Sequence, residues 1–385
     1  MHRTPASRPW LLALASLVLA GLACQAGTPT VAPSDPSQSP AAGPTASVFD
    51  SGRTAFGFFP SPPEASLEAV LNHFNAMGEH GDFVLIQPNI PWEDFRTGIE
   101  GESEQRTDLR NQTVLAQQNN LEWIFVVDPL NGLNRKDFFG LPAGWQASFA
   151  NPDVRAAFTN FTLWIVREFH PRYLGLASEI NTYMDAHPDD VQNYLSLYGE
   201  VYDLIKAEAP DTQVFVTFQW DDLNNIFAIA NEGRPAGQTN WEQVEAFEPR
   251  LDLWVISSYP HFAFPNGEGI PTDYYTRLAE RTNKPLAVGE GGWSSRPDGP
   301  VLGDEQSQVA YLQAIHDQLG EWLSFWVYLI LNDFNLDSFA EVMRAEGRPE
   351  SDIETLSFFA ALGLRQFDGT PKPALALWES FRAED

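Results

Sequence analysis

The sequence feature that most limits the fold is a series of eight short runs of apolar, β-branched and aromatic residues. Most of them are continuously apolar rather than alternating, as expected for strands of a parallel sheet covered on both faces. Their starts lie roughly 30 to 50 residues apart, which leaves room for one helix and two loops between successive strands. The runs are TAFGFF (54–59), FVLIQP (83–88), EWIFVVD (122–128), YLGLASE (173–179), QVFVTFQ (213–219), LDLWVISSY (251–259), PLAVGE (285–290) and FWVYLIL (325–331).

The stretches between the runs carry helix signals. Asn151-Pro152-Asp153 places a capping residue before a proline, which predicts a helix start. Apolar residues recur at helical spacing over about 189–207, which predicts another helix. No Gly-rich phosphate loop follows the first run, so a doubly wound sheet is disfavoured. Eight strand–helix units over residues 49–385 predict an α/β protein with a single (β/α)8 TIM barrel.

The first 48 residues predict export and a linker rather than a folded core. Residues 1–23 have the pattern of a secretory signal peptide, with two arginines before a short apolar run. That run, at about ten residues, is short for a membrane span. Residues 24–48 are rich in Pro, Ser, Thr and Ala and predict a disordered tether. The expected order is signal peptide, tether and one folded domain over residues 49–385.

Cys24 is the only cysteine in the chain, so no internal disulfide is possible. It lies directly after the predicted signal peptide, and GLAC (21–24) resembles the lipobox of bacterial lipoproteins, with Gly where Leu is usual. This resemblance implies a lipid on Cys24 and a protein that is secreted and anchored at the bacterial cell surface or membrane. An ordinary cleavage site followed by an unmodified cysteine is the alternative.

The chain is strongly acidic, with a formal net charge of −29. We therefore do not expect nucleic acid or anionic membrane surfaces as partners, because both would be repelled. Contact with a membrane is expected only through the lipid anchor. A neutral substrate is favoured over a polyanionic one, and we expect a monomer.

Polar and aromatic residues follow the predicted strands, where the active site of a (β/α)8 barrel lies. Neither an H-E-x-x-H motif nor a cysteine pair is present in the sequence, which argues against a zinc hydrolase. The sequence also lacks a G-x-S-x-G motif, which argues against a serine nucleophile. We expect no metal and no organic cofactor in the chemistry. The candidate site residues are Asn89, Trp92, Asp128, Ser178, Glu179, Asn181, Trp220, Tyr259, His261, Glu290 and Trp293.

Glu179 and Glu290 end the fourth and seventh runs. Two carboxyls across a barrel mouth can flank a glycosidic bond, one protonating the leaving oxygen and the other attacking the anomeric carbon. A separation of about 5–5.5 Å gives retention of configuration, and about 6.5–9.5 Å gives inversion. A strand-end glutamate that merely pairs with an arginine or caps a helix is the structural alternative.

Four stretches resemble the retaining (β/α)8 glycoside hydrolase superfamily called clan A, which includes endo-β-1,4-galactanases and many cellulases and mannanases. The resemblance implies a glycosidase in which Glu179 is the general acid/base, Glu290 the nucleophile and Tyr259 a neighbour of Glu290. Its implied substrate is a carbohydrate, a neutral oligo- or polysaccharide. The stretches are LGLASEIN (174–181), SSYPHF (257–262), AVGEGGWSS (287–295) and DGTPKPALALW (368–378).

The sequence departs from that superfamily at Ser178, where an asparagine that binds the sugar 2-hydroxyl is usual. Asn181 is the candidate to compensate. The indoles among the candidates are expected to stack on sugar rings, and His261, Asp128 and Asn89 are expected to contact substrate.

Two other functions remain open at this point. A carbohydrate-binding TIM barrel without hydrolysis would use the same cleft. This alternative stays open because position 178 is a serine and not the usual asparagine. A solute-binding lipoprotein of a transporter would share the signal, anchor and tether, but would have two lobes and a hinge.

Overall fold

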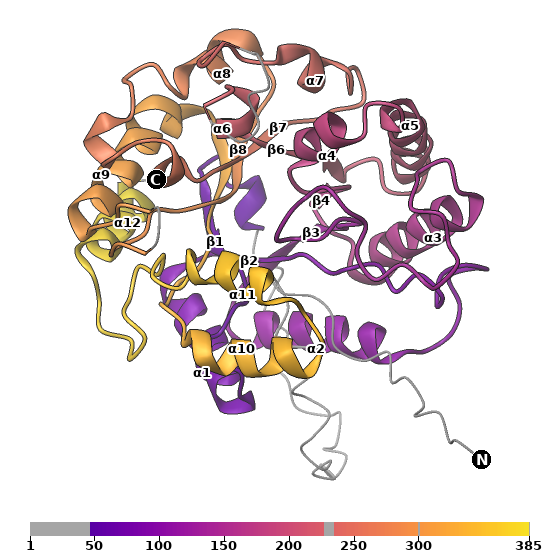
Figure 1. Cartoon of the computed structure of the whole chain (residues 1–385), viewed down its shortest axis with the longest axis horizontal. Coiled ribbons are helices and arrows are strands. Elements are labelled where there is room, and N and C mark those ends of the chain that lie inside the picture. Colours follow the sequence, from indigo (N-terminus) through magenta and orange to yellow (C-terminus); the bar gives the residue numbers. More distant parts are fainter. Residues whose placement is uncertain (1–46, 227–234, 299–300, 385) are drawn as a thin grey trace.

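The computed structural model describes residues 47–226, 235–298 and 301–384, and it confirms the expected (β/α)8 barrel (Figure 1). All the strands are parallel, in the order β5-β4-β3-β2-β1-β9-β8-β7-β6. Each predicted run contains a strand. The strands are β1 (Ala55–Phe58), β2 (Phe83–Ile86), β3 (Glu122–Val126), β4 (Tyr173–Gly175), β5 (Gln213–Phe215), β6 (Thr217–Gln219), β7 (Trp254–Ser258), β8 (Leu286–Gly291) and β9 (Leu323–Tyr328).

The fifth run closes the barrel even though it is divided into two strands at Val216. Its first half, β5, pairs with β4, and its second half, β6, pairs with β7. Backbone hydrogen bonds between Leu176 and Phe215 and between Thr217 and Ala177 continue the contact with the chain after β4. Because β5 and β6 together occupy one strand position, the nine strands of the described residues correspond to the eight predicted strands.

Helices surround the strands (Figure 1). The expected helix start at Asn151 is confirmed, because its side chain accepts a hydrogen bond from the Asp153 N–H. The helices are α1 (Leu67–His80), α2 (Glu104–Gln118), α3 (Pro152–Phe169), α4 (Ile180–Ala186), α5 (Val191–Glu208), α6 (Trp220–Leu223), α7 (Trp241–Glu245), α8 (Thr276–Arg281), α9 (Glu305–Leu319), α10 (Leu336–Ala345), α11 (Glu350–Ser357) and α12 (Pro373–Glu384), with short 3-10 turns at Val48–Asp50, Pro260–Phe262, Gly267–Gly269 and Gly320–Trp322.

Aromatic side chains fill part of the barrel interior. Phe325 of β9 contacts Phe83 of β2, Tyr173 of β4 and Phe215 of β5, with ring centroids 5.0 to 5.9 Å apart. None of these strands is a neighbour of β9 in the sheet, so the contacts cross the barrel. A Cβ on Gly57 of β1 would lie 2.6 Å from the Phe83 ring, so this position has to be glycine for the ring to fit.

The first described residues, from Ser47 on, already contact the barrel. The Ser47 hydroxyl and the Val48 N–H both donate to the Glu122 carboxylate at the start of β3. Phe49 then packs against Phe83 and Tyr173 at the end of the aromatic cluster. The predicted signal peptide, Cys24 and most of the tether lie outside the described residues.

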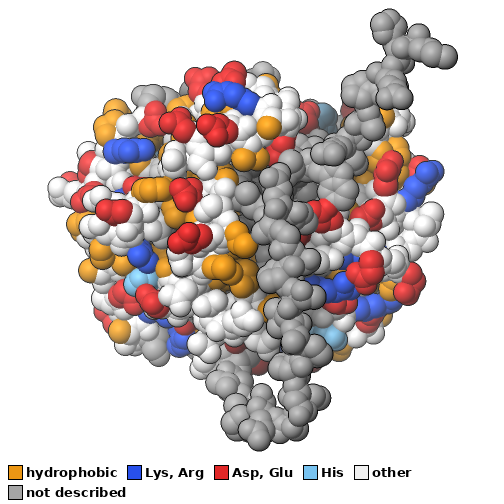
Figure 2. Space-filling view, turned by 90° about the horizontal axis from the view of Figure 1, so that it is seen from below, with side chains coloured by type: hydrophobic (Ala, Val, Ile, Leu, Met, Phe, Trp, Pro, Cys, Tyr) orange, Lys and Arg blue, Asp and Glu red, His pale blue; other side chains and the backbone are white. Residues whose placement is uncertain are grey.

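On the face shown in Figure 2, acidic side chains are numerous and basic ones lie between them. No helix within the described part of the chain is long and apolar enough to cross a membrane.

Replacing Phe325 with alanine tests the importance of the interior aromatic cluster. The side chain is fully buried, so Phe325→Ala should lower the free energy of unfolding by about 3 to 5 kcal/mol, measured by urea denaturation. Phe367→Ala is the control, because this ring is 45% exposed, and it should change stability by less than about 0.5 kcal/mol. Equal effects of the two substitutions would contradict this account of the core.

Candidate active site

Glu179 lies at the carboxyl end of the fourth strand segment, directly before α4. Its backbone has φ 51° and ψ 42°, the left-handed conformation that non-glycine residues rarely adopt. The Glu179 N–H donates to the Thr217 hydroxyl of β6 at 2.7 Å, which stabilises this turn. The Ser257 hydroxyl of β7 donates to Oε1 of the Glu179 carboxylate. Backbone strain held in place by such contacts is common at functional sites.

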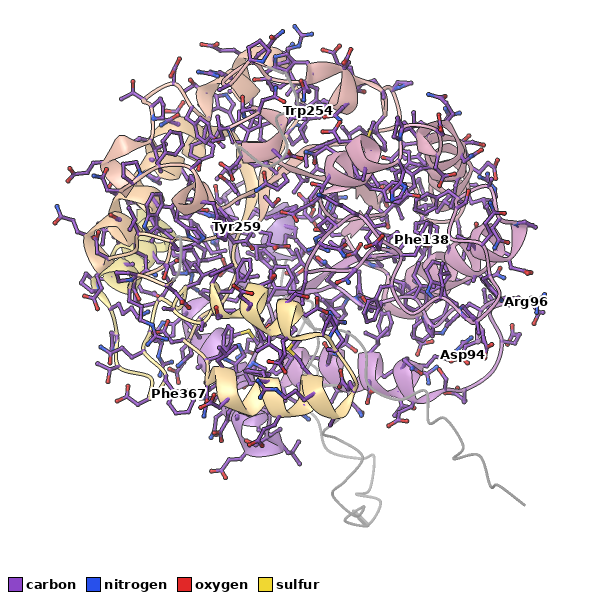
Figure 3. The ribbon with its side chains drawn as sticks, in the orientation of Figure 1. Asp94, Arg96, Phe138, Trp254, Tyr259 and Phe367 are labelled. Atoms are coloured by element: carbon purple, nitrogen blue, oxygen red, sulfur yellow. The ribbon has the colours of Figure 1, made fainter. Side chains whose placement is uncertain are left out.

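Glu290 lies near the end of β8, where it pairs with Ser257 of the neighbouring strand β7. The Tyr259 hydroxyl donates to its Oε1 at 2.5 Å, so the contact expected from the sequence is present. Close packing of β8 on β7 depends on the next residue, since a Cβ on Gly291 would lie 2.6 Å from the Ser258 carbonyl oxygen. Figure 3 places Tyr259 near the middle of the molecule and Arg96 at its outer edge.

The sequence analysis missed Arg135, which joins the two glutamates. Its Nε donates to Glu179 Oε2 at 3.0 Å, and its Nη2 donates to Glu290 Oε2 at 3.4 Å. Its Nη1 donates to the Asp128 carboxylate. The side chain is only 4% exposed, and the backbone is again left-handed, with φ 55°. One planar guanidinium therefore holds three carboxylates together at the mouth of the barrel.

The loop that carries Arg135 is the β3–α3 loop, residues 127–151. Loops longer than about 12–15 residues without secondary structure are commonly functional. The length of this segment between a predicted strand and the Asn151 helix start was therefore a signal available in the sequence. The identity of the residue that reaches the glutamates was not available, because that depends on how the loop folds back.

The burial of these carboxyls changes their protonation. Burial raises the pKa of Glu290 to about 7; the Arg135 charge opposes this rise, the Glu179 charge adds to it, and the Tyr259 hydrogen bond also opposes it. Burial likewise raises the pKa of Asp128, again against the opposing effect of Arg135. A glutamate poised near neutrality in a buried site is typical of catalytic carboxyls.

Asp221, at the start of α6, holds the backbone of Tyr259 in position. Its carboxylate accepts from the Tyr259 N–H at 2.7 Å and from the Tyr274 hydroxyl at 2.6 Å. It is fully buried, and burial raises its pKa to about 6 against these hydrogen bonds. The position of Tyr259, and hence its bond to Glu290, depends on this buried acid.

Asp128 and Asn89 lie side by side just after β3 and β2, where they form an isolated parallel bridge between these two segments. The Asp128 carboxylate also accepts from Gln87 at 2.9 Å and from the Leu130 N–H at 3.1 Å. Asp128 therefore holds Arg135 in the site and is itself held from two directions.

Ser178 and Asn181 have positions that differ from those expected. The Ser178 hydroxyl contacts the Thr217 hydroxyl at 3.1 Å, so it supports the turn at Glu179. The Asn181 amide donates to the Gln219 carbonyl and to Asp222, and its carbonyl accepts from the Gln219 N–H. Because Asn181 is fully buried and uses both ends of its amide to join α4 to β6, its position does not support a compensating sugar contact.

All three tryptophans that were expected to stack on sugar rings are buried, and Trp92 and Trp220 have structural partners. Trp92 is 2% exposed, and its indole N–H donates to the Phe139 carbonyl at 2.7 Å, so it supports the β3–α3 loop. Trp220 is fully buried against Trp241 and Tyr274. Neither indole presents a face to solvent, which corrects the expectation that they stack on a sugar.

Trp293 and His261 pack against each other beside Tyr259. Trp293 is fully buried, and the His261 ring lies edge-on to it at 6.0 Å. The His261 Nδ1 accepts from the Ser294 N–H, and burial lowers the pKa of His261 to about 3, so the ring is neutral at neutral pH. Both residues are buried, and His261 contacts Tyr259.

An aromatic rim that the sequence analysis missed lies next to Tyr259. Phe262 is 37% exposed and contacts Phe358 and Phe359, which follow α11. Phe359 also contacts Tyr259, with ring centroids 5.3 Å apart. The partly exposed Phe262 ring is therefore connected to Tyr259 through Phe359. In the described part of the chain, no group of three or more His, Cys, Asp or Glu residues has a metal-binding arrangement.

The parallel barrel defines the structural class as a (β/α)8 fold, and the expected resemblance is confirmed at the level of fold alone. Solved structures with this fold include an exo-β-1,4-mannosidase from Opitutaceae bacterium strain TAV5, with a TM-score of 0.60 at 15% identity, covering 86% of this chain and 59% of that one. The chain thus spans less than two thirds of the mannosidase.

Two further structures share the fold. One is a GH5_18 protein from Bifidobacterium longum subsp. longum, with a TM-score of 0.59 at 17% identity over 86% of this chain and 79% of that one. The other is a β-glucosidase, with a TM-score of 0.52 at 14% identity over 82% of this chain and 88% of that one. No protein-family model matches the sequence, and a search of curated proteins finds no match.

Removing the Tyr259 hydroxyl tests the electrostatics of Glu290. Tyr259→Phe deletes a hydrogen bond to a charged acceptor, an interaction worth about 1.5 to 3 kcal/mol, and this bond lowers the pKa of Glu290. The pKa of Glu290 should therefore rise above about 7, so that ionisation requires a higher pH. Carbon NMR titration of the glutamate carboxyls measures this shift, and an unchanged or lower pKa would contradict it.

Proposed function

We propose that the protein is a glycoside hydrolase that cleaves a neutral oligo- or polysaccharide with retention of configuration. The observation that carries this proposal is the meeting of Glu179 and Glu290 on one guanidinium at the carboxyl ends of the barrel strands. Catalytic residues of (β/α)8 enzymes come from these strand ends, and paired carboxyls are the usual machinery of glycosidases.

In the proposed reaction, Glu290 attacks the anomeric carbon while Glu179 donates a proton to the leaving glycosidic oxygen. A glycosyl–Glu290 intermediate forms, and Glu179, now a carboxylate, takes a proton from the water that hydrolyses it. Tyr259 supports this role because its hydroxyl stabilises the ionised form of Glu290. The chemistry requires no group beyond these side chains and water.

A β-linked neutral sugar is the proposed substrate. The structures that share the fold are named as an exo-β-1,4-mannosidase and a β-glucosidase, so β-mannosides and β-glucosides are the first candidates. The exposed Phe262 ring beside Tyr259 offers an apolar face for a sugar ring.

Kinetics on para-nitrophenyl β-glycosides test the assignment. On a glycoside that the wild type cleaves, Glu179→Ala and Glu290→Ala should each lower kcat/KM by about a hundred- to ten-thousandfold. Glu68→Ala, at an exposed glutamate on α1, is the control and should match the wild type. Full activity in either site variant would make the assignment wrong, and proton NMR of the first product anomer separates retention from inversion.

A carbohydrate-binding barrel without hydrolysis is the alternative function. The observation that favours it is the pairing of Arg135 with both glutamates. Glycan binding without release of reducing ends would favour it. The two-lobed solute-binding lipoprotein is excluded by the fold, because the described residues form a single barrel.

We also propose that the mature protein is secreted and held at the bacterial surface by a lipid on Cys24. The sequence from Gly21 to Cys24 and the tether after it support this proposal. Cys24→Ser should move the protein from the membrane fraction to the soluble fraction, and it should abolish labelling by a radioactive fatty acid. Membrane association that survives the substitution would contradict the proposal.

A further inference from the structure

A pocket lies next to β1 and β9, at the edge of the barrel where the strands end. Its volume is about 380 Å³, within the range of pockets that hold small ligands. Pro63 and Glu64 follow β1, and Asn332 follows β9. One wall is α1, and the other is the turn formed by residues 365–369, which precedes α12.

This pocket is separate from the candidate active site. Within the described part of the chain, none of its lining residues forms a hydrogen bond or ion pair with Arg135, Glu179 or Glu290. In Figure 3, Phe367 of the pocket lies toward the lower edge of the molecule, whereas Tyr259 lies nearer the middle. A ligand in the pocket therefore does not have to touch the two glutamates.

The turn before α12 holds an aromatic ring in solvent at the pocket. The Gln366 N–H donates to the Thr370 carbonyl at 2.8 Å, and the Gly369 N–H donates to the Gln366 carbonyl at 2.9 Å. The Arg365 Nε donates to the Gly369 carbonyl at 2.9 Å. Phe367 lies within this turn and is 45% exposed. Because a ring left in water adds little hydrophobic stabilisation, its fixed position beside a pocket suits a ligand better than it suits the core.

Unused hydrogen-bonding groups surround the ring. Among the described residues, the Asn72 side-chain amide on α1 has no hydrogen-bond partner, and the Arg365 guanidinium has no ion-pair partner. The Glu64 carboxylate accepts from the Ser66 hydroxyl at 3.2 Å and lines the same pocket. The pocket therefore offers donors and an acceptor beside one apolar face.

The charges of the pocket disfavour an anionic ligand. Of the described residues that line it, Arg365 is the only arginine or lysine, and acidic residues outnumber it. His73, on the buried side, is neutral at neutral pH because burial lowers its pKa to about 4. A neutral ligand with an apolar face and with hydroxyls that both donate and accept matches this lining, and a sugar has that chemistry.

We propose that this pocket is a second carbohydrate-binding site, in which a neutral oligosaccharide lies against Phe367 and forms hydrogen bonds with Asn72 and Arg365. The inference goes beyond the proposed glycosidase function, because binding here uses neither Glu179 nor Glu290. A glycan bound in the pocket stays at the edge of the barrel that carries both glutamates, which raises its effective concentration there.

Methyl NMR observes the pocket directly, because Ala69 and Ala76 line it. The Glu290→Gln variant, labelled at its alanine methyl groups, is titrated with mannotetraose and with cellotetraose, which it should leave intact. At least one of these probes should shift the Ala69 and Ala76 methyl signals until they saturate. Unshifted signals with both probes would overturn the proposal.

The Ala177 methyl separates this proposal from the proposed function, because Ala177 lies two residues before Glu179. Saturating shifts at Ala69 and Ala76 without a shift at Ala177 would support the pocket and count against glycan binding at the glutamates. A shift at Ala177 alone would overturn the pocket and leave the proposed function standing.

Phe367→Ala removes the aromatic face from the pocket, so the Kd measured at Ala69 and Ala76 should rise about three- to tenfold. Trp322→Ala is the matched control, because it truncates a 49% exposed aromatic residue that does not line the pocket. This control should leave the titration unchanged. An equal Kd in Phe367→Ala and in its parent would contradict a sugar lying on this ring.

Asn72→Ala tests the polar side of the pocket. Loss of one hydrogen bond to the sugar should raise the Kd at the pocket about three- to tenfold. Asn75→Ala is the control on the same helix, since the Asn75 amide donates to Glu79 at 3.3 Å and does not line the pocket. The same Kd in both asparagine variants would exclude Asn72 from sugar binding and overturn the proposed arrangement.

Discussion

The geometry of the site depends on one buried cluster of charges, the Arg135 guanidinium with the carboxylates of Asp128, Glu179 and Glu290. Removing such charges from water costs several kcal/mol for each ion, which is repaid only when hydrogen bonds satisfy them closely. Each carboxylate meets this condition with a further donor, from Gln87, Ser257 and Tyr259 respectively. These donors lie at the carboxyl ends of β2 and β7. The barrel strands therefore hold in place the hydrogen bonds that offset the cost of burying these charges.

The charges of this cluster come from two different parts of the fold. The carboxylates belong to strand ends that the barrel core holds in position, with Glu290 within β8 itself. The cation belongs to the long β3–α3 loop, whose Leu130 and Phe149 lie in the main core and whose Leu133 packs against a smaller cluster of α10 and α11. A guanidinium cannot give up its charge, so the electrostatics of the glutamates at constant pH depend on the position of Arg135.

Much of the barrel could be predicted from the sequence, and the reason is physical. Strands buried on both faces have to be continuously apolar, so all eight runs were visible, and the acids that follow them could be assigned to one edge of the sheet. Strand ends were placed less well: β4 stops at Gly175, whereas the predicted run continues to Glu179, whose own backbone is left-handed. The burial of Trp92 and Trp220 was not predictable either, since a residue after a strand can face the mouth or the surrounding helices.

The sequence alone determined the fold class and the two glutamates, because hydrophobic patterning and strand-end position are local properties that a single chain displays. Only the tertiary structure decided that Arg135 joins those glutamates, that Ser178 supports a turn, and that Phe262 provides the exposed ring beside Tyr259. Each of these depends on which loops fold back over the mouth. That choice is made by contacts between residues far apart in the chain, such as Arg135 and Glu290, which no local pattern records.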